Sequence, residues 1–173
     1  MQIVGDEMNL QNQLYFQQCV EKLCRDEKVL SMDQNRQHGD TSCLEHSLAV
    51  AYFSYRFSMA LHIAVDAESL IRGAVLHDFF LYNRKDDPKR YRWHGFTHPS
   101  VALANAEKQF DLTKIERDII KKHMFPLTVQ FPRFRESYIV CLWDKLCCFN
   151  ELCRFSKKRF RQILRMLRLR VSA

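Results

Sequence analysis

The 173-residue sequence has few residues that interrupt helices, since it contains only four glycines and four prolines. Its apolar residues recur mostly at helical spacing rather than alternating as in a strand. It contains no uncharged apolar run of about 18 residues, so no transmembrane helix is expected. It also lacks a Gly-rich phosphate loop and a G-x-S-x-G motif, which excludes the classes of enzyme that depend on them. We therefore expect an all-α, single-domain helical bundle.

Cysteine is plentiful, with seven residues, but no C-x-x-C pair occurs. This spacing argues against a zinc-thiolate site, and the odd number argues against a complete disulfide framework. The acidic N-terminus, residues 1–7, lacks the apolar core of a signal peptide. These features together predict a cytoplasmic protein whose cysteines are reduced.

The net charge of +7 is concentrated at the C-terminal end of the sequence. Residues 1–153 contain 19 Lys and Arg against 20 Asp and Glu, whereas residues 154–173 contain eight basic residues and no acidic one. We therefore expect a helical domain over 1–153, with its core at about 36–150, and a basic amphipathic helix over 154–173. That helix could pack on the domain with its basic side in solvent. Alternatively, residues 157–170 could contact an anionic membrane surface or a nucleic acid.

Two strongly polar residues, His77 and Asp78, stand inside the apolar stretch 74–80. Burying a carboxylate without a partner is costly. A metal ion removes that cost, because it binds an ionised Asp and a neutral His together. The structural alternative is a buried His bonded to a backbone carbonyl, beside an Asp paired with a basic residue. We expect the pair at the end of a helix that Asp66 caps.

Further polar residues stand in similar apolar contexts along the chain. His46, His123 and Asp144 each interrupt a helical apolar pattern. Pro99 suits the first turn of a helix, which makes His98 the expected N-cap residue. Each of these residues alone is more often structural than functional. Five such sites on different predicted helices, all imidazole or carboxylate, are difficult to explain as independent coincidences.

The ordered series resembles the HD-domain superfamily of metal-dependent phosphohydrolases. The core pattern of that superfamily, H…HD…D, matches His46, His77, Asp78 and Asp144, and the contexts of the intervening histidines are similar to those of small stand-alone bacterial HD proteins. The resemblance covers about residues 36–150. In one departure, Phe79-Phe80-Leu81 follows the pair where many HD proteins have Gly and Lys.

The resemblance implies a site for divalent metal ions, with two ions bound (Mn, Fe, Mg, Co, Ni or Zn). The ligands of the first ion would be His46, His77, Asp78 and Asp144. Asp78 would bridge to the second ion, which His98 and His123 would complete, with His94 as the alternative to His98. Two ions about 3.5–4 Å apart would activate a shared water, and the resulting hydroxide would attack phosphorus. His77 and Asp78 are therefore also the catalytic residues that the resemblance implies.

The substrate that the resemblance implies is a nucleotide or another small phosphorylated metabolite. Its phosphate needs cationic partners, and the candidates are Arg84, Lys85 and Arg92, in a loop expected over 83–97, and Lys122 beside His123. Each of these cations could instead be a solvated surface charge. Two other functions stay open: a di-iron oxygenase of the HD type, and a non-catalytic ligand-sensing or RNA-associated HD module.

Overall fold

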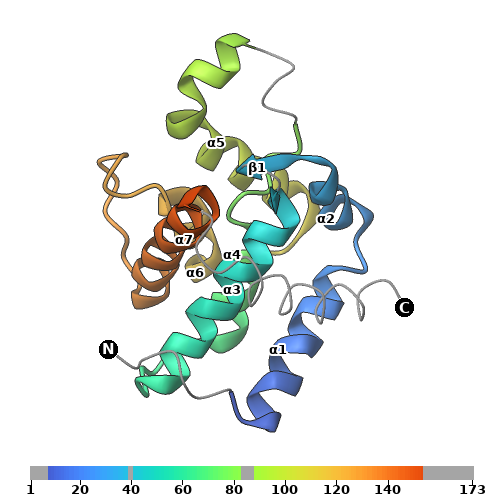
Figure 1. The fold of residues 1–173 in the computed structure, drawn as a ribbon, viewed down its shortest axis with the longest axis vertical. Coiled ribbons are helices and arrows are strands. Elements are labelled where there is room, and N and C mark those ends of the chain that lie inside the picture. The colour runs from blue at the N-terminus through green and yellow to red at the C-terminus, as the bar shows by residue number, and fades with distance from the viewer. Residues whose placement is uncertain (1–7, 39–40, 83–87, 154–173) are drawn as a thin grey trace.

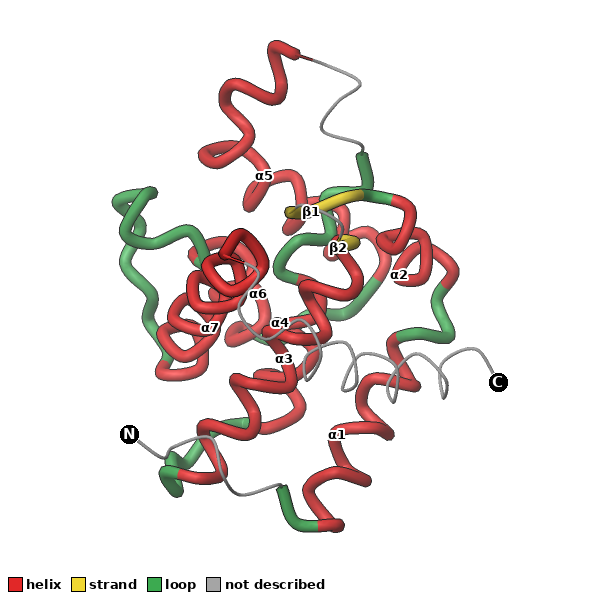
Figure 2. The backbone as a smooth tube through the Cα atoms, in the orientation of Figure 1, coloured by secondary structure: helices red, strands yellow, loops and turns green. Residues whose placement is uncertain are grey.

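The structure is a computed structural model that describes residues 8–38, 41–82 and 88–153. Within these residues the chain is a helical bundle with one short pair of antiparallel strands (Figures 1 and 2). The all-α prediction is confirmed. The first elements are α1 (Leu10–Leu23), α2 (Glu27–Ser31), a 3-10 turn (Met32–Gln34), β1 (Arg36–His38) and β2 (Thr41–Ser42). The remaining helices are α3 (Cys43–Ala60), α4 (Ala67–Leu76), α5 (Pro88–Gln109), α6 (Lys114–Lys122) and α7 (Arg135–Cys153).

No helix among the described residues is both long enough and apolar enough to cross a bilayer. The basic helix predicted for 154–173 lies outside the described residues. The apolar spacing of residues 8–30 in the sequence predicts one amphipathic helix, but α1 ends at Leu23. It breaks after Leu23, because Asp26 accepts hydrogen bonds from the backbone N–H groups of Lys28 and Val29 and thereby starts α2.

Helix α4 is the centre of the bundle and contacts α1, α3, α6 and α7. Its apolar side chains from residue 70 onward are fully buried, because neighbouring helices cover it on several sides. Asp66 caps its N-terminus by accepting from the N–H of Ser69, as predicted. The helix ends at Leu76, so His77 and Asp78 enter the interior directly after its last turn.

Helices α6 and α7 are joined by a buried carboxylate. The sequence Thr113-Lys114-Ile115-Glu116 predicts a capping box, and the structure has this capping box at the start of α6. Asp118, one turn further on, accepts a hydrogen bond of 2.7 Å from the Ser137 hydroxyl and one of 2.8 Å from the N–H of Arg133. The connection before α7 and the first turn of that helix are therefore held against α6.

The structure differs from the prediction in the segment before His98. The loop expected over 83–97 is helical from Pro88 onward, and His98 lies inside α5 rather than at its N-cap. Pro99 remains within the helix although it has no N–H to donate to the backbone ladder. The prediction was wrong because Pro99 and Ala102 are buried against the bundle, and that burial outweighs the lost hydrogen bond.

Gly73 allows α4 and α6 to approach closely, and this approach brings His77 and His123 together. A Cβ at Gly73 would lie 2.6 Å from Cδ1 of the fully buried Ile119. We expect Gly73→Ala to lower the free energy of unfolding by about 1–2 kcal/mol, because overpacking exceeds the gain in helix propensity. Urea denaturation measures the change.

The matched control for this substitution is Gly95→Ala in α5. A Cβ there would lie 3.3 Å from Cδ2 of Leu127, the tip of a half-exposed side chain that can move aside. The control should be neutral or stabilising by up to about 1 kcal/mol. Equal stabilities for Gly73→Ala and the unaltered protein would contradict the packing argument.

Candidate metal centre

Five separate segments bring six imidazole and carboxylate side chains into one cluster. His46 lies in the first turns of α3, His77 and Asp78 follow α4, His98 is inside α5, His123 follows α6, and Asp144 is in the middle of α7. The first and last members are 98 positions apart in the chain and in direct contact. None of the six is more than 5% exposed. We call these side chains the histidine–aspartate cluster.

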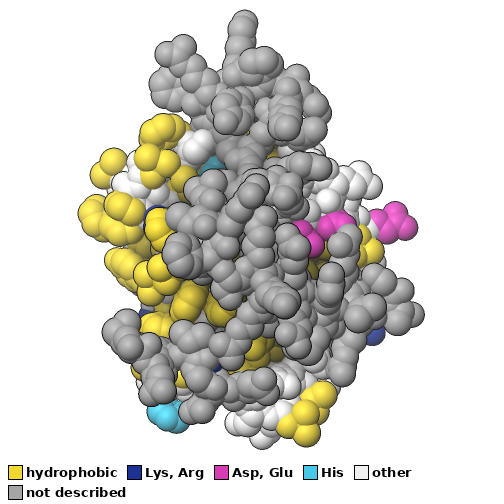
Figure 3. All heavy atoms as spheres, viewed as in Figure 1, with side chains coloured by type: hydrophobic (Ala, Val, Ile, Leu, Met, Phe, Trp, Pro, Cys, Tyr) yellow, Lys and Arg dark blue, Asp and Glu magenta, His cyan; other side chains and the backbone are white. Residues whose placement is uncertain are grey.

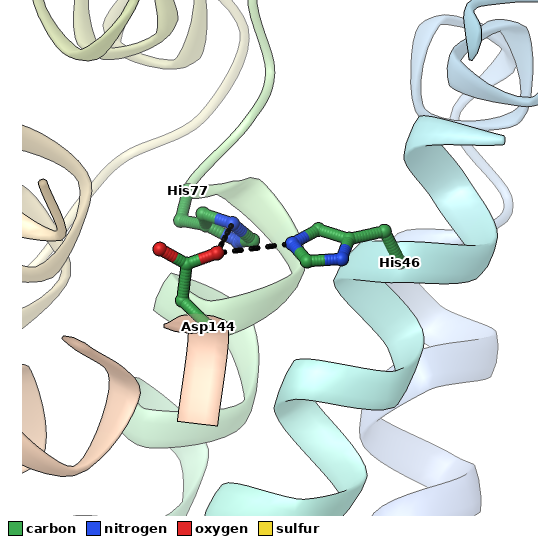
Figure 4. A group of neighbouring side chains, drawn as sticks. All are labelled: His46, His77 and Asp144. Atoms are coloured by element: carbon green, nitrogen blue, oxygen red, sulfur yellow. Dashed lines mark hydrogen bonds and ion pairs between the residues drawn. The ribbon is translucent and has the colours of Figure 1, made fainter. Parts of the chain in front are cut away.

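One part of the cluster is formed by His46, His77 and Asp144 (Figure 4). Nε2 of His46 lies 3.1 Å from Oδ1 of Asp144, and Nε2 of His77 lies 3.7 Å from the same oxygen. The two imidazole rings, one from α3 and one from the turn after α4, therefore face a single carboxylate oxygen.

The other part surrounds Asp78. Its Oδ2 lies 3.4 Å from Nε2 of His77, and its Oδ1 lies 3.1 Å from Nε2 of His98 and 3.6 Å from Nε2 of His123. The rings of His98 and His123 also meet, with 2.7 Å between their Nε2 atoms. Asp78 thus presents one oxygen to each side of the cluster, which is the position that a bridging carboxylate needs.

Backbone carbonyls orient two of the imidazoles. Nδ1 of His77 donates to the carbonyl of Ala74 at 2.7 Å, and Nδ1 of His123 donates to that of Ile120 at 2.9 Å. A carbonyl can only accept, so the proton of each neutral ring is on Nδ1 and the lone pair of Nε2 faces the cluster. Both carbonyls belong to the last turn of a helix, where they have no partner within the helix.

The donor atoms fit a divalent cation. Two groups, His46 with His77 and Asp144, and His77 with Asp78 and His123, have ligand atoms that all lie within 4.8 Å of one another. Nε2 of His77 is buried and has no hydrogen-bond partner among the residues that the structure describes. Imidazole nitrogen and carboxylate oxygen suit Mn, Fe, Co, Ni, Zn and Mg. These groups could therefore hold metal ions.

The pKa of each of several side chains in the cluster depends on the charge of its neighbours there. Burial works to lower the pKa of His77, but the carboxylates of Asp78 and Asp144 outweigh it and raise the pKa to about 10. Burial works to raise the pKa of each carboxyl, yet His77 with His98 holds the pKa of Asp78 well below its usual range, and His46 with His77 does the same for Asp144. Burial lowers the pKa of His123 to about 3, and His77 and His98 act in the same direction. The interior thus keeps two ionised carboxylates and favours a cation between them.

Two neighbours of the cluster were not identified from the sequence. Lys145 donates to the carbonyl of His123 at 2.9 Å, and its Nζ lies 3.9 Å from Oδ2 of Asp144, so one cation links α6 to α7. The amide of Asn105 donates to the carbonyls of Phe79 and Phe80 at 3.2 and 3.0 Å, which holds the turn after Asp78. Only the position of Lys145 next to Asp144 could have indicated its role.

Of the predicted substrate-binding residues, only Lys122 has a side chain that the structure describes. The Lys122 ammonium lies 2.5 Å from Oδ1 of Asp118, so contact with a phosphate would compete with this ion pair. Arg84 and Lys85 lie outside the described residues, and Arg92 and His94 lie in α5 at positions whose side chains are not described. The described side chain of His98 places an imidazole beside Asp78 and His123.

Because the pKa of His77 is raised, metal binding should displace a proton. At pH 8, between the ordinary pKa of a histidine and about 10, we expect Mn²⁺ to release about one proton from His77. Affinity should therefore increase with pH and level off above about 10. Titration calorimetry in buffers of different ionisation enthalpy measures the release. His62→Ala, which removes an exposed histidine, is the control; an affinity independent of pH between about 7 and 9 would contradict the expectation.

Comparison with known proteins agrees with this geometry. A family model described as HD domain matches residues 43–147, more than half of the chain, and the match includes all six residues of the cluster. No curated protein and no solved structure matches the chain significantly. HD domains are in general metal-dependent hydrolases that bind divalent metals. The chain therefore belongs to the HD-domain family.

Proposed function

We propose that this protein is a metal-dependent phosphohydrolase that acts on a nucleotide or another small phosphorylated metabolite. One observation carries the proposal: two buried groups of imidazole and carboxylate donors share His77, and the second group contains Asp78. Membership of the HD-domain family supports the reaction class. The donor set supports divalent ions of the Mn, Fe, Co, Ni, Zn and Mg series, with two ions as the proposed number.

The proposed ligands divide between two ions. His46, His77, Asp78 and Asp144 would hold the first, and Asp78, His98 and His123 the second. Divalent ions in such a site supply charge that makes water nucleophilic at neutral pH and neutralises phosphoryl oxygens. Asp78 would be a ligand of both ions, because its two oxygens face different members of the cluster.

The protein itself contributes orientation and the exclusion of water. Ala74 and Ile120 fix the rings of His77 and His123, so each presents a lone pair without rotating. The near-complete burial of the carboxylates keeps bulk water from competing for them. Lys145 holds the carbonyl of His123 and lies beside Asp144, and its half-exposed side chain places a positive charge between the cluster and solvent. A phosphate ester carries the negative charge that such a position favours.

Loss of Asp78 tests the proposal directly. We expect Asp78→Ala to reduce metal content and to abolish phosphate release from nucleotides, by at least about a thousandfold, since it removes the ligand common to both ions. Elemental analysis and a phosphate-release screen with metal-loaded protein give the two readouts. Asp111→Ala, at an exposed carboxylate, should leave both unchanged.

Three outcomes of this experiment would count against the proposal. Full metal content in Asp78→Ala would refute the bridging role. An unaltered protein that binds metal but releases no phosphate from any nucleotide or sugar phosphate would refute the reaction. Iron-dependent turnover that requires oxygen would assign the same donors to a di-iron oxygenase instead.

The number of ions is tested by removing the proposed ligands of the second ion, His98 and His123. His98→Ala and His123→Ala should each lower the metal content from about two ions to about one, because both imidazoles belong to the proposed second site. His62→Ala, which removes an exposed imidazole, should keep two. Elemental analysis at equal protein concentration decides the matter. Unchanged stoichiometry in both variants would refute the proposed second site at His98 and His123.

A further inference from the structure

One side of the molecule exposes a continuous hydrophobic surface. Seven of the thirteen exposed large hydrophobic side chains among the described residues lie on α7 or on the connection before it, so they are not scattered singly. Four belong to α7: Tyr138, Leu142, Leu146 and Phe149. Three belong to the connection: Leu127, Val129 and Phe131. We call these seven side chains the apolar face.

The two parts of the apolar face are physically joined. Residues 138, 142, 146 and 149 follow helical spacing and therefore share one side of α7. The ring of Phe125 lies 5.0 Å from that of Phe131 and 6.4 Å from that of Tyr138, so aromatic contacts connect the loop to the helix. Figure 3 shows hydrophobic side chains gathered on the side where Figure 1 places α7 and this connection. Surfaces of this kind are typical of sites that bind another partner.

The charges on the same segment indicate which partner. Within residues 124–149 the exposed charged side chains are Arg133, Arg135 and Lys145, whereas both acids, Glu136 and Asp144, are buried. A two-fold contact between copies of the chain through this face would bring the same cations together. A nucleic acid would bind the cations but would leave aliphatic side chains such as Val129 and Leu142 without a partner.

The sequence that follows α7 also has an excess of positive charge. Cys153 ends the helix one turn after Phe149, and the next 20 residues contain eight basic side chains and no acid. The rest of the chain, by contrast, is close to neutral. A surface that combines apolar side chains with an excess of positive charge matches an anionic lipid bilayer, which accepts the former in its interface and attracts the latter.

We propose that the apolar face docks onto the surface of an anionic lipid bilayer. Val129 and Phe131, which are 85% and 63% exposed, enter the interface, and the stripe on α7 lies along it. Asp144 is on the buried side of the same helix, so docking covers the side of α7 that faces away from the histidine–aspartate cluster. The interaction therefore brings the protein to a membrane surface without involving any residue proposed to hold metal.

Vesicle sedimentation of the full-length protein tests the proposal. We expect binding to phosphatidylcholine vesicles that contain about 30% phosphatidylserine, little binding to phosphatidylcholine alone, and weakening as salt is raised. The combined variant Val129→Ser, Phe131→Ser and Leu142→Ser should bind the anionic vesicles at least about tenfold more weakly.

The matched control makes the same chemical change away from the apolar face. Leu10→Ser, Leu14→Ser and Leu61→Ser together replace three side chains that are 71%, 46% and 50% exposed, and should leave vesicle binding unchanged. Thermal unfolding and metal content of both variants show that the fold is retained.

Three results would overturn the proposal. The first is no binding of the unaltered protein to anionic vesicles. The second is equal binding by the apolar-face variant and the unaltered protein, which would assign any lipid contact to residues 154–173 alone. The third is a dimer in solution that the apolar-face variant dissociates, since a second copy would then cover the surface. A variant that unfolds is replaced by the single substitution Val129→Ser, for which about a threefold loss is expected.

Discussion

Two ionised carboxylates in the interior are the constraint on which the rest of this structure depends. Asp78 and Asp144 are almost completely buried, and desolvation alone would make each of them very unfavourable. Four imidazoles from four helical segments surround them, and the pKa of His77 is raised to about 10 because it faces both. The bundle therefore has to bring these segments to one point, and its central helix, α4, ends at the histidine–aspartate cluster.

The surrounding scaffold fixes the donor atoms with backbone groups that helices leave free. The last turns of α4 and α6 each use a carbonyl to hold an imidazole, so the end of a helix orients a ring without a dedicated side chain. Gly73 lets these two helices approach, and Lys145 joins the end of α6 to α7. A rigid arrangement of donors is what metal-assisted hydrolysis requires, because a displaced ligand costs affinity and rate together.

Much of the fold and of the cluster could be predicted from local patterns. The helical class, the cap at Asp66 and the capping box at Thr113 depend on neighbours within one or two turns, and the structure agrees with each. The environment of His98 was predicted incorrectly, because a proline at position 99 normally starts a helix and only packing of α5 on the bundle keeps it inside one. Lys145 was missed because the carbonyl of His123, to which it donates, approaches it only after α6 and α7 have packed.

The amino-acid sequence by itself determined which chemistry is available: six imidazole and carboxylate groups placed among apolar residues, in an order shared with the HD-domain family. It determined this because a polar residue whose sequence neighbours are apolar at helical spacing is expected to be buried with them. Only the tertiary structure decided which oxygen of Asp78 faces which ring, which cation joins two helices, and that α7 turns one side to the cluster and an apolar side to solvent. Those features depend on distances between segments far apart in the chain, and such distances arise only when the helices pack.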